Sequence, residues 1–178
     1  MRRLRYNVAM SLDGYIADAH DAFDWIPDDD TVDFAALFAR VDTIILGRRS
    51  YDVVRAQGEV PWKPGTRVFV VSRTLAPESG DGVTIVSGDP VAIASSLRRE
   101  SGDGEIWLFG GGRLFAELLA GNQVDAVEVT IVPVLLGSGV SMLARTPGRA
   151  PLVLTGTHVY PSGMVALSYG VPGAISHG

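Results

Sequence analysis

Short runs of β-forming residues alternate with helical patterns along most of the chain, and this alternation limits the folds available to it. Strands are predicted at Leu4–Ser11, Thr43–Leu46, Val68–Val71, Val83–Val86, Glu105–Phe109 and Val124–Val132. Helices are predicted at Val32–Arg40, Ser50–Arg55, from Pro90 to about Arg99, and across Leu114–Leu119. This order indicates an α/β fold with a largely parallel sheet.

The end of the chain breaks the pattern. Leu152–Tyr160 and Met164–Val171 form an expected antiparallel hairpin closed by Pro161-Ser162-Gly163. No internal repeat or low-complexity linker divides the 178 residues, a length typical of one domain. We therefore expect a single domain over residues 1–178, with a mixed, mostly parallel sheet and a C-terminal hairpin.

Composition excludes several kinds of function. The net charge of −5 and the pI near 5.1 give no general attraction to nucleic acid or to anionic membranes. The chain has no cysteine, and its three histidines show no ligand spacing, so no metal site is expected. No run approaches the roughly 20 apolar residues that span a bilayer, and the expected location is the cytoplasm.

Two predicted strands end in residues suited to phosphate. Gly47-Arg48-Arg49-Ser50 follows the strand at Thr43–Leu46 and opens a helix, whose N-terminus offers free N–H groups and partial positive charge. Ser72-Arg73-Thr74 follows the strand at Val68–Val71, at the strand end where open α/β sheets bind ligands. Either segment alone could be an ordinary polar turn.

A third junction, Gly110-Gly111-Gly112-Arg113, joins a strand to a helix. Glycine lets the backbone approach a pyrophosphate closely, where a Cβ would interfere. The segment is not the dinucleotide fingerprint of a Rossmann domain, which would need glycine at Phe115 and a place in the first strand–helix unit. Three such junctions on one sheet favour a nucleotide site.

The same segments resemble the dihydrofolate reductases, in order and over nearly the whole chain. The resemblance implies a dihydrofolate-reductase-like three-layer sandwich and a preference for NADPH over NADH. Arg48, Ser72, Arg73 and Arg113 become candidates for the 2′-phosphate. The matching segments are Val8–Ala17, Ile44–Tyr51, Val70–Thr74 and Ile106–Phe115, and the implied cofactor residues are Ala9, Ile16, Gly47, Arg48, Arg49, Ser50, Ser72, Arg73, Gly110, Gly111, Gly112, Arg113, Leu114 and Phe115.

Two segments are closer still to the reductase domain of bifunctional riboflavin-biosynthesis enzymes. These are Ala9–Gly14 and Val132–Gly139. That domain reduces a ribosylaminouracil phosphate. The deaminase that accompanies this domain uses a zinc held by His and Cys. This chain has no Cys and no room for a deaminase domain. The resemblance thus implies a stand-alone reductase that forms a homodimer, with the apolar C-terminal hairpin as a candidate interface.

Resemblance also suggests the substrate residues. In the reductase family, the acid that delivers the proton lies a few residues after a Trp and near the start of the first helix. Trp25 followed by Asp30 matches that spacing, and Asp33 is a second candidate for the catalytic acid. Phe34 would face the substrate, and Thr130 resembles a threonine that pairs with the acid. The family's Pro-Trp pair is Asp24-Trp25 here, and Asp28-Asp29-Asp30 could instead be solvated helix-capping groups.

Several functions remain open from sequence. The leading hypothesis is an NADPH-dependent oxidoreductase of riboflavin biosynthesis or a related step, acting on a small pyrimidine- or pterin-type heterocycle. A true dihydrofolate reductase is the second. A protein that binds NADP(H) without turnover is the third, and an α/β domain with no nucleotide site is the fourth. A measurement of NADPH binding would distinguish the domain with no nucleotide site from the other three hypotheses.

Overall fold

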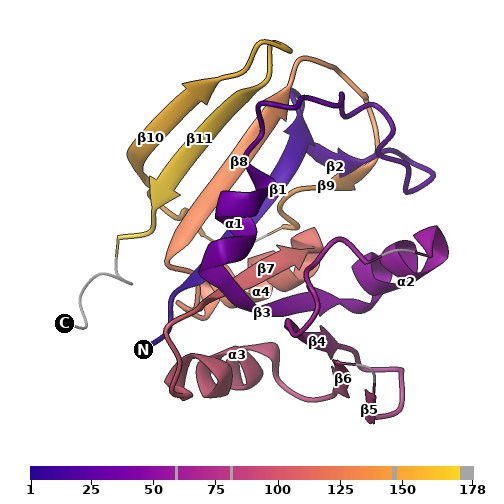
Figure 1. Ribbon diagram of the computed structural model, residues 1–178, viewed down its shortest axis with the longest axis vertical. Coiled ribbons are helices and arrows are strands. Elements are labelled where there is room, and N and C mark those ends of the chain that lie inside the picture. Colours follow the sequence, from indigo (N-terminus) through magenta and orange to yellow (C-terminus); the bar gives the residue numbers. More distant parts are fainter. Residues whose placement is uncertain (59, 81, 146–147, 173–178) are drawn as a thin grey trace.

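The computed structural model describes residues 1–58, 60–80, 82–145 and 148–172. Within these ranges nine strands form one mixed sheet in the order β10-β11-β8-β1-β7-β3-β4-β6-β5 (Figure 1). Its strands are β1 (Leu4–Ser11), β3 (Val41–Gly47), β4 (Arg67–Val71), β5 (Glu78–Gly80), β6 (Val83–Val86), β7 (Glu105–Gly110), β8 (Ala126–Val132), β10 (Val153–Val159) and β11 (Val165–Gly170). A separate pair joins β2 (Tyr15–Ala17) to β9 (Val140–Ser141).

The six strands from β8 to β6 are mutually parallel, and both edges of the sheet are antiparallel. Strand β1 pairs in parallel with β7 on one side and β8 on the other. Strand β3 is parallel to β7 and β4, and β4 is parallel to β6. The antiparallel partners are β5 at one end and the β10–β11 hairpin at the other.

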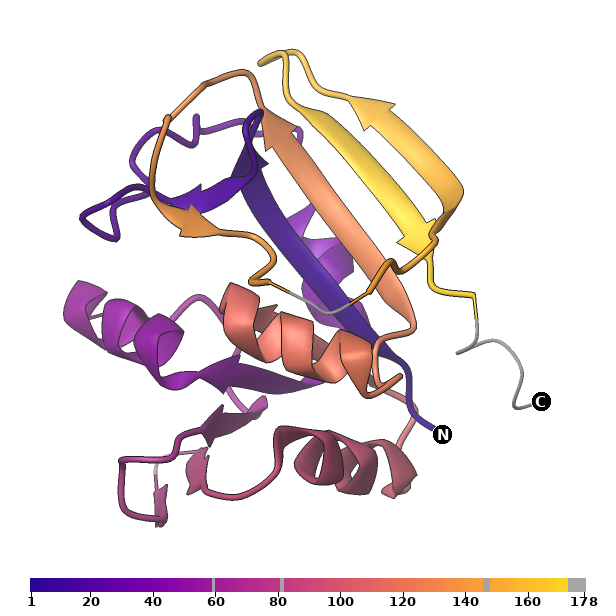
Figure 2. The ribbon, with the colours of Figure 1, turned by 180° about the vertical axis from the view of Figure 1, so that it is seen from behind.

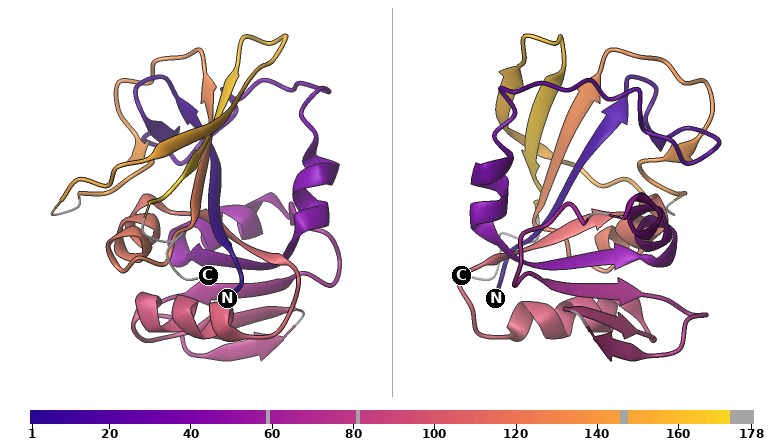
Figure 3. Two further views of the ribbon diagram at one scale, coloured as in Figure 1. Left: turned by 90° about the vertical axis from the view of Figure 1, so that its left-hand side faces the viewer. Right: turned by 45° about the vertical axis from the view of Figure 1, so that its right-hand side comes forward.

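Four helices cover the two faces of the sheet. Helices α3 (Pro90–Arg99) and α4 (Gly112–Ala120) pack into one core cluster with β1, β7 and β8. Helices α1 (Phe34–Arg40) and α2 (Arg48–Gln57) pack into a second cluster with β3 and β4. Side views show helices on both sides of the sheet (Figure 3), and the view from behind shows α4 in front of it (Figure 2).

The central strands bury both of their faces, as parallel strands between helical layers must. In β7 the side chains of Ile106 and Leu108 enter the first cluster, while Trp107 enters the second. The Tyr6 ring is fully buried and stacks on Phe115 with 4.0 Å between ring centroids. Burial raises the pKa of the Tyr6 hydroxyl, which donates to the Met142 carbonyl at 3.2 Å.

Buried arginines anchor the beginning of the chain. Arg98 donates to Asp125 at 2.7 Å and to the Gln123 carbonyl at 2.9 Å, and its backbone carbonyl receives the Arg2 N–H. Asp125 in turn accepts from the Leu4 N–H at 2.7 Å. These charged groups are tolerated in the interior because each is paired and hydrogen-bonded.

Most predicted elements are present with ends shifted by a few residues. Strands β1 and β6 and helix α3 have the predicted bounds, and the C-terminal hairpin is present. The short strands β2, β5 and β9 were not predicted, because three or fewer residues carry too little pattern. The capping prediction for Asp28-Asp29-Asp30 was wrong: α1 begins later than expected, and Asp33 caps it by accepting from the Ala36 N–H at 2.8 Å.

Candidate functional site

The three glycine- and arginine-bearing junctions lie together at one edge of the sheet. They follow β3, β4 and β7, which are neighbouring parallel strands, so their carboxyl ends face the same way. A Cβ placed on Gly47 would lie 3.9 Å from the Gly110 carbonyl oxygen. The Ser50 hydroxyl would be 3.3 Å from a Cβ on Gly110 and 3.6 Å from one on Gly111. The junctions of β3 and β7 are therefore in contact.

Two helices begin at this edge without a side-chain cap. The N-cap residues are Gly47 for α2 and Gly111 for α4, and neither can offer a side-chain acceptor. The first N–H groups of both helices thus keep their capacity to bind an anion. Gly111 has a φ of +76°, a conformation that L-residues with side chains seldom adopt.

Gly112 is required by a different contact. A Cβ at this position would collide with the Ser141 carbonyl oxygen and lie 2.9 Å from that of Met142. The chain after β9 passes over the start of α4 here, and the Ala144 N–H donates to the Gly112 carbonyl at 3.1 Å. The role of Gly112 in the structure is close packing of backbone on backbone.

Arginines surround this edge and are largely exposed. Arg48 donates to the Thr74 hydroxyl at 2.5 Å, which links the β3 junction to the β4 junction. The Arg73 side chain is 70% exposed and reaches Glu117 of α4 at 3.1 Å. Arg113 is exposed, and within the described part of the chain its side chain has no bonded partner.

Some predicted cofactor residues are used by the fold itself. Ser72 is buried, and its hydroxyl accepts from the N–H groups of Thr74 and Leu75 at 3.2 and 3.0 Å. Leu114 and Phe115 are buried in the core beneath α4. Their side chains therefore stabilise the loop and helix that carry the junctions rather than facing outward from them.

The loop after β1 comes back over the sheet. Ile16 lies in β2, which packs against β1 and pairs with β9. Asp13 accepts from the Ser11 hydroxyl at 2.6 Å and from the Gly137 N–H at 2.7 Å, contacts that hold the pKa of its carboxyl below the ordinary value. Asp21, further along, forms an ion pair with Arg49 of α2 at 2.6 Å.

A large open cavity is lined in part by Ala9 of β1. It has a volume of about 1620 Å³ and is bounded by the segment between β2 and α1, by helices α1 and α2, and by strands β1, β8, β10 and β11. Ala9 lines it and pairs with Thr130 of β8, which also lines it. Pockets of at least several hundred cubic ångströms bind small ligands, so this cavity is the candidate substrate site.

Of the predicted substrate residues, the structure brings two to the cavity. Thr130 lines its floor, and Phe34 lines its wall with 57% of its surface exposed. Trp25 is not among the lining residues. Its indole N–H donates to the Ala22 carbonyl at 3.2 Å, which ties the loop to itself.

Both predicted acids line the cavity and are exposed. Asp33 is committed to the cap of α1, while Asp30 has no side-chain hydrogen bond or ion pair within the described residues. Neither carboxyl is enclosed by apolar side chains. The desolvation that would tune a carboxyl for proton delivery therefore requires a bound ligand covering the cavity.

Asp29, directly before Asp30, has a structural role. It accepts from the Thr31 hydroxyl and N–H, and from the Ser162 N–H at 3.2 Å. Its contacts with Ser162, followed by the two bonds from Thr31, lower the pKa of Asp29 to about 2. This carboxylate fastens the loop before α1 to the turn between β10 and β11.

A polar group on the cavity floor was not predicted from the sequence. Glu128 and Asn7 line the cavity, and the Asn7 amide donates to Glu128 at 2.8 Å. Arg5 bonds both Glu128 and Glu105, the latter at 2.7 Å. Burial alone would raise the pKa of Glu105, but hydrogen bonds and charge from Arg5 outweigh it and lower the pKa. A strand period of two was the available signal, because Glu128 lies two residues before Thr130 and Asn7 two before Ala9.

A metal site and a membrane-spanning helix each place requirements on the described residues. Among them, no three His, Asp or Glu side chains are grouped to hold a metal ion. None of their helices is long and apolar enough to cross a membrane.

Comparisons with known proteins agree with this geometry. The structure of a riboflavin biosynthesis protein from Shewanella sp. PV-4, named as putative, superposes with a TM-score of 0.81, at 30% identity over 96% of this chain and 99% of that one. Dihydrofolate reductase from Enterococcus faecalis, solved with NADP(H), gives a TM-score of 0.67 at 17% identity, over 96% of both chains. The uncharacterised Bacillus subtilis protein YwjB is 29% identical, over 84% of this chain and 87% of that protein.

The sheet order, the helical layers and the superposition on dihydrofolate reductase confirm the predicted dihydrofolate-reductase-like fold. A family model described as the RibD C-terminal domain matches residues 2–166. The chain belongs to the RibD C-terminal domain family.

The Asp29 tether makes stability depend on pH. The folded pKa of about 2 lies below the ordinary value of 3.8, so the contribution to stability is complete only above about pH 5 and is lost as pH falls through 3.8 towards 2. We expect Asp29→Asn to lower the urea midpoint at pH 7 and to flatten its change between pH 4 and 2. Asp28→Asn is the control, since Asp28 has no side-chain bond within the described residues. An unchanged pH profile in Asp29→Asn would contradict the tether.

Proposed function

We propose that this protein is a stand-alone NADPH-dependent reductase of a pyrimidine- or pterin-type heterocycle, acting in the cytoplasm. The reaction would be most like that of the 5-amino-6-(5-phosphoribosylamino)uracil reductase of riboflavin biosynthesis. One observation carries the proposal: three phosphate-suited junctions share one sheet edge, and a large cavity opens beside them. Family membership and the likeness to a riboflavin biosynthesis protein support it.

The residues at the sheet edge suit a dinucleotide. The uncapped starts of α2 and α4 would bind its pyrophosphate, aided by Arg48 and Arg49. Arg73 and Arg113 would hold the 2′-phosphate, because an exposed guanidinium gives a strong charge-assisted bond to phosphate. Ala9 and Ile16 would border the nicotinamide. NADPH, when bound, would supply the hydride.

Substrate would occupy the cavity, with one face towards Ala9. Thr130 would hydrogen-bond its ring, and Phe34 would pack against it. Asp30 or Asp33 would deliver the proton that accompanies hydride transfer, through water where the distance requires it. A ligand that covers these carboxyls would raise their pKa by desolvation and improve them as proton donors.

The Arg73 guanidinium provides a test of cofactor choice. We expect Arg73→Ala to weaken NADPH binding about ten- to hundredfold, the loss of a charged hydrogen bond, and to leave NADH binding nearly unchanged. Isothermal titration of both nucleotides measures this. Arg99→Ala is the matched control, because Arg99 is exposed on α3 and, among the described residues, bonds only Ser95. Equal binding of NADPH by all three proteins would exclude Arg73 from the 2′-phosphate site.

The two acids can be separated from their structural roles. Asparagine caps helices as well as aspartate does, so Asp33→Asn should keep α1 intact while removing the acid. We expect either Asp33→Asn or Asp30→Asn to reduce kcat by about 10²–10⁴-fold, with NADPH affinity retained. Asp103→Asn, an exposed change on another loop, is the control. Full turnover in both acid variants would reject these acids, and absence of turnover in the wild type would favour an NADP(H)-binding protein.

We further propose that two copies associate through the β10–β11 hairpin. Strand β10 is the free edge of the sheet and exposes Val153, Leu154 and Val159. An exposed apolar edge strand is a surface that proteins usually cover. In light scattering we expect a dimer that Val159→Asp converts to monomer. Leu135→Asp, at an equally exposed apolar residue outside the hairpin, should leave the dimer intact. A monomeric wild type would refute this interface.

A further inference from the structure

The cavity beside Ala9 has a strongly acidic lining. Its lining residues include one arginine, Arg40, and two histidines, His20 and His158. The lining also includes seven carboxylates: Asp21, Asp24, Asp28, Asp29, Asp30, Asp33 and Glu128. The cavity itself defines the site, and these side chains set its electrostatic potential.

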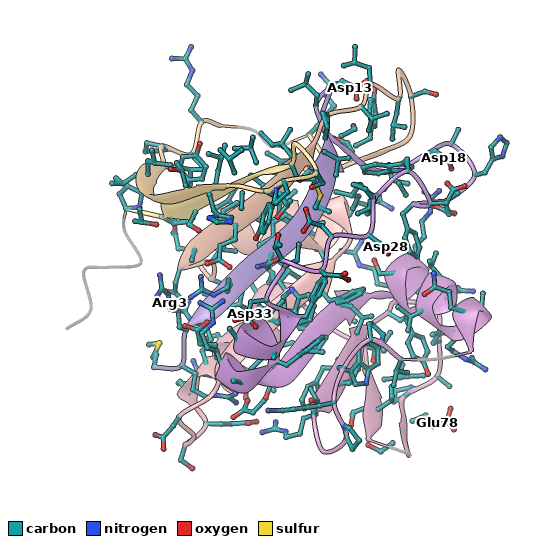
Figure 4. All side chains as sticks on the ribbon, turned by 45° about the horizontal axis from the view of Figure 1, so that its top comes forward. Arg3, Asp13, Asp18, Asp28, Asp33 and Glu78 are labelled. Atoms are coloured by element: carbon teal, nitrogen blue, oxygen red, sulfur yellow. The ribbon has the colours of Figure 1, made fainter. Side chains whose placement is uncertain are left out.

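Two of the seven carboxylates are neutralised by the fold. Asp21 is paired with Arg49, and Glu128 is bonded to Arg5. The other five all lie in the segment between β2 and the start of α1. Within the described part of the chain, none of these five forms an ion pair. Figure 4 labels two of them, Asp28 and Asp33, on this segment, with Asp33 at the start of α1.

The single lining arginine is already engaged. Arg40 lies 3.8 Å from Glu128, whose carboxylate also receives the Asn7 amide. A phosphate that approached Arg40 would have to compete with Glu128 and would meet the five unpaired aspartates. The arginines suited to phosphate, Arg48, Arg73 and Arg113, follow the ends of β3, β4 and β7 instead, and none of them lines the cavity.

We propose that the cavity selects an uncharged or cationic heterocycle and rejects its phosphorylated form, with the aspartates of residues 24–33 as the specificity determinant. This inference rests on the proposed reductase function and narrows its substrate. It sets the protein apart from a reductase that acts on a ribosylaminouracil phosphate.

The physical reason is the charge of a phosphate monoester. Such a group carries about −1.5 to −2 charges near neutral pH. Placed among unpaired carboxylates it is repelled, and like-charge juxtaposition is a common means of rejecting a wrong ligand. An amino-substituted ring, in contrast, offers N–H donors to the same oxygens, and a protonated ring gains from their charge.

The test uses 5-amino-6-ribitylaminouracil and its 5′-phosphate as probes. The protein is first titrated with NADP⁺ in the calorimeter, and each probe is then added to the saturated complex. We expect the unphosphorylated probe to bind at least about tenfold more tightly than its phosphate. Raising the salt concentration should narrow that difference, because screening weakens the repulsion.

Matched variants identify the residues responsible. Asp24→Asn/Asp28→Asn removes two charges from the lining, at residues without side-chain bonds in the described structure, and should improve binding of the phosphate selectively. The control Glu78→Gln/Asp103→Asn removes two charges elsewhere and should leave binding of the phosphate unchanged. Glu78 lies on β5, far from Asp28 (Figure 4). Arg40→Gln should not weaken the phosphate selectively.

Each other outcome overturns the inference. Equal or tighter binding of the phosphate would do so, as would its selective loss in Arg40→Gln, which would make Arg40 a phosphate anchor. Binding of neither probe would reject the substrate class. Failure of the first titration, with NADP⁺, would instead reject the cofactor assignment, and the two failures are therefore distinguishable.

Discussion

The position of β1 at the centre of the sheet governs the rest of the structure. It pairs in parallel with β7 and with β8, strands that lie about a hundred residues further along the chain. This double pairing divides the sheet into two halves with different uses. On one side, β7, β3 and β4 end in glycine and arginine; on the other, β8 and β11 form the floor of the cavity. Ala9 lies on β1 itself, at the boundary.

The charges follow the same division. Arg5 on β1 is buried and bonds Glu105 of β7 on one side and Glu128 of β8 on the other, so it joins the two halves with paired charges. Exposed arginines lie at the ends of β3, β4 and β7, whereas aspartates that form no ion pair within the described residues lie around the cavity. A dinucleotide and a heterocycle that meet at Ala9 would thus lie in opposite electrostatic surroundings.

The fold and the grouping of three glycine- and arginine-bearing junctions at one sheet edge could be predicted from sequence because their signals are local. A buried strand followed by Gly47 or by Gly110 is visible in a few residues, and the rule that parallel strands align brings these ends together. The cavity depended on distant contacts. Asp29 and Ser162 are 133 residues apart, and nothing near either one predicts their bond. Glu128 was accessible through strand periodicity, whereas the use of Trp25 within its own loop depended on a turn with no sequence signature.

We propose that a nicotinamide dinucleotide binds across the ends of β3, β4 and β7. Nuclear magnetic resonance of the ¹⁵N-labelled protein, titrated with NADP⁺, tests it most directly. We expect the largest amide shifts at Gly47, at Gly110–Gly112 and around Arg73, with smaller ones near Ala9. Absence of shifts at these glycines, or shifts confined to the β5–β6 edge, would contradict the assignment.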